Sequence, residues 1–355
     1  MTLCHIVITL QEYIMKNIDL KTLTVQAAID MHLCPLLTPR VIYKPFLYPE
    51  CHKAWQTQQL MHWMPEEVPM ADDVRCWAYN LTDNERNFIT QIFRLFAQSD
   101  IAVHNCYLEH YSKVFQPIEV KMMLTSFQNM ESCHTHAYAY LIDTLCLPDT
   151  MYSDFLEYQE MRDKWDLWMT CKSDTLSEFA VTLATFGGLI EGMVLFSSFV
   201  MLLNFSRFNK MKGMSQIIAW SVRDESLHTQ SMCMLFKTLM SEIPELWTDE
   251  LRQTIIERTK SIVLLEDKFI ELAFATGGIE GLTIAEMQNH IRTLADEMLG
   301  LLGLSPIYFI TNDPVRKWVN HILYGMEFVN FFENRSTDYA KATTVGQWSE
   351  VKFES

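Results

Sequence analysis

Apolar residues recur every three to four positions along most of the chain, which is the spacing of one helical face. The clearest case follows Thr82, which with Glu85 three residues later makes the capping box of a helix start. That helix carries an apolar face from Phe88 to Phe96 and is expected to reach about Val114. Alternating runs typical of strands are weak throughout. The pattern therefore predicts an all-α fold.

Breakers and caps divide the rest of the chain into further helices. Residues 16–50 are predicted to be irregular because prolines interrupt them repeatedly. Pro117 suits the first turn of a helix that reaches about Leu145. Either Ser173 or Asp174 is the expected cap of a long apolar helix that ends near Asn204. Further helices are predicted over residues 50–63, 151–170, 209–240, 247–275, 283–302 and 313–332.

The two ends of the chain lack this periodicity. We predict a partly irregular N-terminal extension over residues 1–46, a helical domain over 47–333 and a flexible C-terminal tail over 334–355. The apolar start lacks the basic residues and cleavage pattern of a signal peptide, and Met15 is an alternative first residue. The apolar run Gly192–Leu203 is too short to span a bilayer and is expected to form a buried core helix.

Charge and cysteine usage narrow the function classes. The formal net charge of -16 argues against nucleic-acid binding, because phosphates would be repelled. The nine cysteines form no C-x-x-C pair and are odd in number, which indicates free thiols rather than a disulfide framework or a zinc ribbon. We expect a cytoplasmic protein without a membrane anchor.

Two Glu-x-x-His motifs, Glu131–His134 and Glu225–His228, carry the candidate chemistry. Residues three apart share a helix face, so each pair directs a carboxylate and an imidazole the same way. One such motif arises easily by chance on a surface helix. Here each follows a solitary acid in an apolar helix: Asp100 lies 31 residues before Glu131, and Glu191 lies 34 before Glu225.

Repetition of this unit predicts two helical hairpins that bring six side chains together. Four buried carboxylates would repel one another unless cations lay between them. Carboxylates with histidines suit iron or manganese. The arrangement is recognised as that of ferritin-like di-iron and di-manganese bundles. His104 and His136 are weaker candidate ligands, since His104 has no counterpart in the second hairpin and His136 leaves the Glu131–His134 face.

Tyr138 lies four residues after His134 and is expected on the same face, about one turn from the metals. A phenol at that distance can be oxidised by a metal centre, although an ordinary core tyrosine fits the spacing equally well. Tyr140 is close in sequence but turned away from that face.

Four segments resemble elements of the small subunits of class I ribonucleotide reductases, and the similarity runs from about residue 47 to 339. Residues 131–138 match the family's E-x-x-H-x-x-x-Y element, and residues 221–228 match its S-V-R-D-E-x-L-H element. Residues 58–68 resemble its W-x-P-E-E element, and residues 330–335 resemble the end of its last helix.

The resemblance implies roles for individual residues. Asp100, Glu131 and His134 would bind one metal, and Glu191, Glu225 and His228 the other. Tyr138 would hold a stable radical. Leu195 and Phe199 would keep water away from the radical. Radical transfer would involve four residues, which are Trp63, Asp224, His134 and Tyr339.

The resemblance further implies the small subunit of a ribonucleoside-diphosphate reductase. Such a homodimer uses two iron ions and O2 to form the radical, and passes it to the large subunit, where ribonucleotides are reduced to deoxyribonucleotides. Manganese–iron or di-manganese centres are also compatible. The chain has no Gly-rich phosphate loop and no C-terminal dithiol, so we expect it to be inactive alone. The alternatives are a ferritin-like storage protein, a di-metal oxidase or oxygenase of apolar substrates, and a helical scaffold.

Overall fold

The computed structural model describes residues 19–322, and within that range the chain is helical and contains no strand. Two isolated bridges, Thr24–Thr175 and Ile279–Leu282, are the β-type pairings found there. Contacts divide the chain into two units, one up to Asp313 and one from Pro314 onward. In the second unit, residues 314–322 form a helix. The predicted all-α fold is confirmed.

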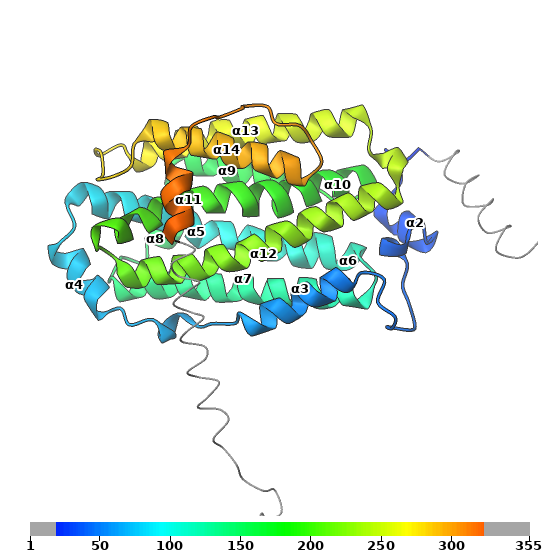
Figure 1. The fold of residues 1–355 in the computed structure, drawn as a ribbon, viewed down its shortest axis with the longest axis horizontal. Helices are drawn as coiled ribbons and strands as arrows, with labels where there is room; N and C mark the ends of the chain where they lie inside the picture. Colours follow the sequence, from blue (N-terminus) through cyan, green and yellow to red (C-terminus); the bar gives the residue numbers. More distant parts are fainter. Residues whose placement is uncertain (1–18, 323–355) are drawn as a thin grey trace, which may run out of the picture. The chain divides into compact units, whose positions relative to one another are not determined.

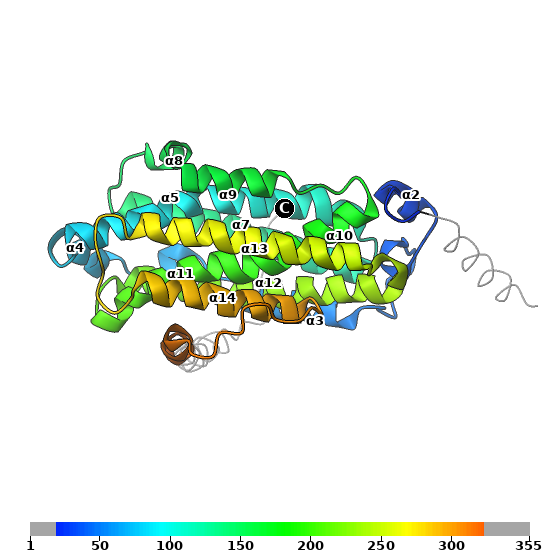
Figure 2. The ribbon, with the colours of Figure 1, turned by 90° about the horizontal axis from the view of Figure 1, so that it is seen from above.

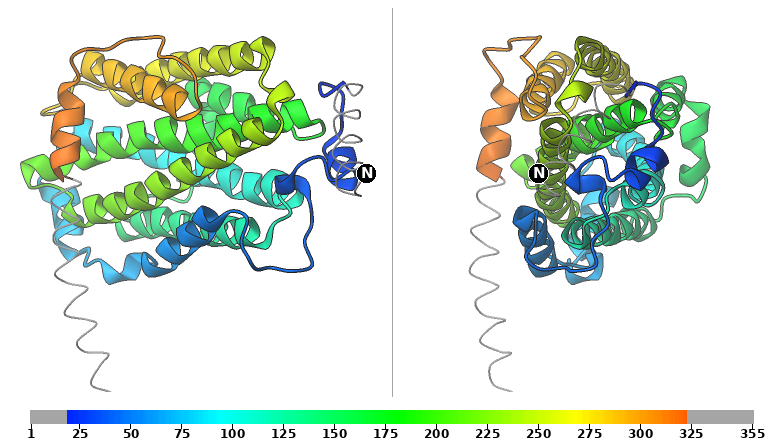
Figure 3. Two further views of the ribbon diagram at one scale, coloured as in Figure 1. Left: turned by 45° about the vertical axis from the view of Figure 1, so that its right-hand side comes forward. Right: turned by 90° about the vertical axis from the view of Figure 1, so that its right-hand side faces the viewer.

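Two helical hairpins form the middle of the first unit (Figure 1). In one, α5 packs against α7; in the other, the run α10–η5–α11 packs against α12. Contacts between α7 and α12 join the two hairpins. The right-hand view of Figure 3 looks along the helices of the bundle. These elements are α5 (Asp83–Cys106), α7 (Ile118–Thr144), α10 (Leu176–Ala184), η5 (Thr185–Leu195), α11 (Phe196–Leu203) and α12 (Lys212–Glu242).

Additional helices cover these hairpins. α3 (Pro49–Leu60) packs on α7, while α13 (Asp249–Ala273) and α14 (Ile284–Leu301) pack on η5. α13 lies between α14 and α9 (Figure 2), and a buried Lys164–Glu266 ion pair of 2.5 Å links it to α9. The shorter segments are α2 (Val25–Asp30), α4 (Ala71–Tyr79), α6 (Ser112–Val114), α8 (Met151–Asp154), α9 (Gln159–Met169), η1 (Pro35–Leu37), η2 (Pro65–Glu67), η3 (Tyr107–Tyr111), η4 (Phe155–Glu157), η6 (Asn204–Phe208) and η7 (Pro244–Leu246).

Side-chain caps determine where several helices begin. The capping box of Thr82 and Glu85 starts α5 as predicted. α10 starts from a second box, in which Thr175 accepts from the backbone N–H of Glu178, so neither Ser173 nor Asp174 is the cap. Thr175 is the residue that has a glutamate three positions later, which explains the preference. Pro117 is the N-cap of α7.

Both acid-bearing helices depart from regular α geometry. η3 continues α5, and η5 occupies eleven residues around Glu191; both are π-helical. The helical run Leu176–Phe208 is long and apolar enough to cross a membrane, but 94% of its most apolar window is buried inside the fold. It is thus a core helix, as predicted for its apolar centre.

Three local predictions were wrong. Residues 25–30 form α2, which Thr24 caps by accepting from the N–H of Ala27, although this region was predicted to be irregular. α4 was not predicted, and the predicted helix over 151–170 is interrupted at Tyr158. The end of the predicted helix over 313–332 and the predicted tail, with Tyr339, lie outside the described residues.

Candidate di-metal centre

The two Glu-x-x-His motifs face each other across the contact between α7 and α12. Glu131 and His134 lie one turn apart on α7, and Glu225 and His228 lie one turn apart on α12. Both helices are regular at these positions, so the spacing of three directs each pair to one side. All four residues are at most 1% exposed.

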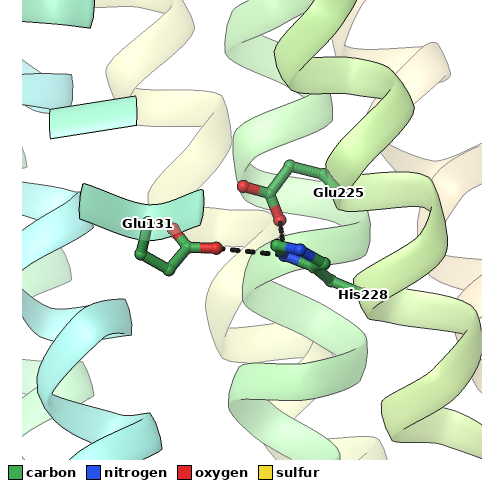
Figure 4. A group of neighbouring side chains, drawn as sticks. All are labelled: Glu131, Glu225 and His228. Carbon is green, nitrogen blue, oxygen red and sulfur yellow. Dashed lines mark ion pairs between the residues drawn. The ribbon is translucent and has the colours of Figure 1, made fainter. Parts of the chain in front are cut away.

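The four side chains have a nearly twofold arrangement. The Nδ1 atom of His134 lies 3.5 Å from Oε2 of Glu131 and 3.1 Å from Oε1 of Glu225. The Nδ1 atom of His228 lies 3.0 Å from Oε1 of Glu131 and 3.5 Å from Oε2 of Glu225. Each glutamate therefore reaches both histidines with one oxygen each. Figure 4 shows Glu131 and Glu225 approaching the ring of His228 from different helices.

Asp100 on α5 and Glu191 on η5 flank this group, and they are 2% and 0% exposed. Burial, and then the charge of Glu131, raise the pKa of Asp100 well above its usual value. Burial, and then Glu225, raise the pKa of Glu191 in the same way. The charge of His134 opposes the rise in the pKa of Asp100, and the charge of His228 opposes the rise in the pKa of Glu191. Both solitary acids are thus buried within electrostatic range of the group.

These six residues fit divalent cations. Several of their buried polar atoms make no hydrogen bond of good geometry within the described part of the chain. They are Oδ2 of Asp100, Oε1 and Oε2 of Glu131, Nδ1 of His134, Oε1 of Glu191, Oε2 of Glu225 and Nδ1 of His228. Unpaired oxygen and nitrogen atoms that converge in a dry interior are costly unless cations satisfy them. Mixed carboxylate and imidazole donors suit iron or manganese.

The charges within the group already compensate one another in part. Burial alone would raise the pKa of Glu131, but His134 and then His228 lower it to about 2. Burial alone would lower the pKa of His228, but its contacts with Glu131 and Glu225 raise it to about 10. Metal ions bind the neutral imidazole, so protons compete with metal ions for these two rings.

Asp224 connects this group to Trp63 on the far side of His134. The indole Nε1–H of Trp63 donates to Oδ2 of Asp224 at 2.7 Å, and Nε2 of His134 lies 3.3 Å from the same oxygen. All three side chains are at most 2% exposed. The structure therefore places these three predicted residues in one buried chain of contacts.

Tyr138 is buried and packs against aromatic rings. Its ring stacks on Phe96 with centroids 4.5 Å apart, and Phe96 in turn contacts Phe199 at 5.4 Å. The centroid of Tyr138 lies 6.5 Å from that of His134. Burial, and then Asp100, raise the pKa of the phenol well above its usual value. Tyr138 is therefore a neutral, dry phenol beside the group.

Two site residues were missed by the sequence analysis. The hydroxyl of Tyr107 donates to Oε2 of Glu191 at 3.2 Å, and Gln58 contacts both Asp224 and His228 at 3.1 Å. Tyr107 follows Asp100 by seven residues, a two-turn spacing that could have indicated a shared face. Gln58 offered no comparable signal, because its partners are more than 160 residues away.

The weaker candidate histidines lie apart from the group. His104 is only partly buried and lines a surface groove with Ile101 and Ser132. His136 is exposed and pairs with Glu66 at 2.6 Å. Neither contributes an atom to the cluster of Glu131, Glu225 and His228.

A bundle of two helical hairpins around buried carboxylates and imidazoles defines the class of ferritin-like di-metal carboxylate proteins. The family model "Ribonucleotide reductase, small chain" matches residues 40–314, so the chain belongs to this family of di-metal (iron or manganese) carboxylate enzymes. Over 331 residues, the chain is 40% identical to a probable ribonucleoside-diphosphate reductase small subunit of Invertebrate iridescent virus 3, covering 88% of each chain.

Solved structures agree on the fold. The ribonucleotide reductase R2 subunit from Clostridium botulinum superposes with a TM-score of 0.70 at 22% identity, covering 78% of this chain and 88% of that one. The dimanganese(II)-NrdF of Streptococcus sanguinis superposes with a TM-score of 0.66 at 18% identity, covering 78% and 98%. At these identities the likeness concerns the bundle itself.

Proposed function

We propose that this small chain of a ribonucleoside-diphosphate reductase forms a radical on Tyr138 beside a di-metal centre and passes it to the large subunit. Asp100, Glu131 and His134 would hold one metal ion, and Glu191, Glu225 and His228 the other. Glu131 and Glu225 lie between the two histidines, and each points one oxygen at each imidazole ring. When bound, the metal pair would use dioxygen as the oxidant of a phenol.

The surroundings of Tyr138 support this role. A radical survives only if water and reductants are kept away from it. Phe96, Leu195 and Phe199 are at most 1% exposed, and Phe96 covers one face of the phenol ring. These residues would exclude solvent while leaving the phenol close to His134.

The observation that carries the proposal is the contact chain from His134 through Asp224 to Trp63. A storage protein or an oxygenase has no need for an indole tied to its metal histidine through a carboxylate. Here Asp224 would orient the imidazole and hold the indole within electron-transfer distance. Tyr339 is the proposed next carrier towards the large subunit; it lies outside the described residues.

A second copy of the chain is the proposed partner of α7. An exposed or half-buried stripe runs along this helix at successive turns, at Ile118, Met122, Thr125, Asn129 and Ser132. Surface grooves flank the stripe on both sides, one against α3 and one against α5. Ile101 and Ile118, one in each groove, are 41% and 44% exposed, and a second copy seated on this face would cover both. A cytoplasmic location agrees with the eight free cysteines among the described residues.

The test is electron paramagnetic resonance of the metal-free protein after addition of Fe(II) and air, with Mn(II) and both metals as parallel loadings. We expect a tyrosyl signal that disappears in Tyr138→Phe. Tyr140→Phe is the matched control, because Tyr140 lies on the same helix but is half-buried and outside the group. Trp63→Phe should keep the signal while abolishing turnover with the large subunit. A signal of full intensity in Tyr138→Phe would refute the assignment.

A further inference from the structure

Gln58 on α3 is a buried amide with no place in the radical chain proposed above. Its side chain is 1% exposed, which is rare for a glutamine. The amide nitrogen Nε2 donates to Oδ1 of Asp224 at 3.1 Å. Its Oε1 atom lies 3.1 Å from Nε2 of His228. One glutamine thus connects the second histidine to the carboxylate that already contacts the first.

The chemistry of these contacts fixes every proton in the chain. The Gln58 atom that faces Asp224 is the NH2 group, which donates to the carboxylate oxygen. The amide oxygen of Gln58 must then face His228, and it too can only accept. Nε2 of His228 therefore carries a hydrogen, and Nδ1 is left to face Glu131 and Glu225.

We propose that Gln58 is a positioning residue that holds His228 with its Nδ1 lone pair directed at the proposed metal site. The inference rests on the proposed di-metal function. Asp224 performs the same task for His134 directly, since Oδ2 faces Nε2 of that ring. A single carboxylate thus orients both metal histidines, one by contact and one through Gln58.

This arrangement makes the two halves of the site unequal. The inner atoms of the two histidines are related by a near twofold, but His134 has a carboxylate behind it and His228 a neutral amide. An imidazole whose ring N–H is bonded to a carboxylate donates electrons to a metal ion more strongly than one whose N–H is bonded to an amide. The two proposed metal positions should therefore differ in affinity, and Gln58 should act selectively on the weaker one.

The test uses Co(II) added to the metal-free protein, followed by proton magnetic resonance and calorimetric titration. Ring N–H protons of cobalt-bound histidines give strongly shifted signals that persist only where an acceptor protects them from exchange. Wild type should show two such signals. Gln58→Met, of similar length but with only a weakly accepting thioether, should lose one signal and bind cobalt about tenfold or more weakly at one site. Gln56→Met is the matched control, because Gln56 lies on the same helix and is exposed.

In Gln58→Glu, the buried neighbour Asp224 favours a proton on the oxygen that faces it, so the side chain keeps a donor towards Asp224 and an acceptor towards His228. It should keep both signals, which also covers the case in which Gln58→Met does not fold. Two unchanged signals with wild-type cobalt affinity in folded Gln58→Met would overturn the proposal, as would the loss of a signal in Gln58→Glu. Failure of wild type to bind two cobalt ions would instead contradict the di-metal function itself.

Discussion

Replacing Gly187 by alanine should disturb both stability and metal binding, because η5 approaches α12 very closely there. A Cβ atom at Gly187 would lie 2.5 Å from Cβ of Met232, whereas an ordinary contact is 3.4–4 Å. Cβ is fixed to the backbone, so a change of rotamer cannot relieve the overlap. The two helices would have to separate by about 1 Å in a close-packed core. Glu191 lies four residues further along η5 and would move with it.

Overpacking of this kind costs about 1–3 kcal/mol, and the better helix propensity of alanine offsets at most ~1 kcal/mol of it. In a chain of 355 residues this corresponds to a fall of up to about 4 °C in the melting temperature of the metal-free protein. Gly300→Ala in α14 is the control, since no atom lies within 4 Å of the added methyl group. It should melt at or slightly above the wild-type temperature. Equal melting temperatures and equal Mn(II) affinities in the two variants would refute the reasoning.

Two further predictions concern protonation and orientation of the ligands. In the metal-free protein, His228 with its pKa of about 10 contributes stability that is complete below its unfolded value near 6.5 and is lost as the pH rises through 10. Glu131 with its pKa of about 2 contributes stability that is present above about 4.5 and is lost as the pH falls through 2. Because metal ions compete with the proton on His228, the affinity for Mn(II) should rise between pH 6 and 8, and binding should release protons. Calorimetry in buffers of different ionisation enthalpy measures this release. An affinity that does not depend on pH would contradict the prediction. Tyr107→Phe should weaken metal binding about tenfold by freeing Glu191, with a near-wild-type melting temperature, and unchanged binding would show that the hydroxyl contact is dispensable.

The features predicted correctly from the sequence are those with a local signal. The capping box at Thr82 and the two Glu-x-x-His pairs depend on residues three apart, and α5, α7 and α12 are regular where these residues lie. The side chains of Asp100 and Glu191 were predicted to be buried because each acid interrupts an apolar face, and both are. Their roles as ligands remain predictions.

The features that were missed depend on contacts between distant segments or on irregular backbone. Gln58 meets His228 across 170 residues, and Tyr107 meets Glu191 across 84. The π-helical geometry of η5 has no counterpart in a pattern of period 3.6, so the orientation of Glu191 could not be derived from its position in the apolar run. The boundary of α10 was misplaced because three neighbouring polar residues could each serve as a cap.

The irregular helices also explain how so much negative charge stays in the core. Pairing with His134 and His228 offsets part of the cost of burying Glu131 and Glu225, but each buried carboxyl group would still gain by moving towards water. Gly187 and Gly192 let η5 approach α12 and α14 too closely for any added side-chain atom, so neighbouring helices enclose Glu191. Glu191 cannot turn outward without separating these helices. Helix packing, together with the pairing of the two glutamates with the two histidines, thus holds the ligands in place before metal arrives. The metal-loaded protein should accordingly melt well above the metal-free one, and the gain should be smallest in Gly187→Ala.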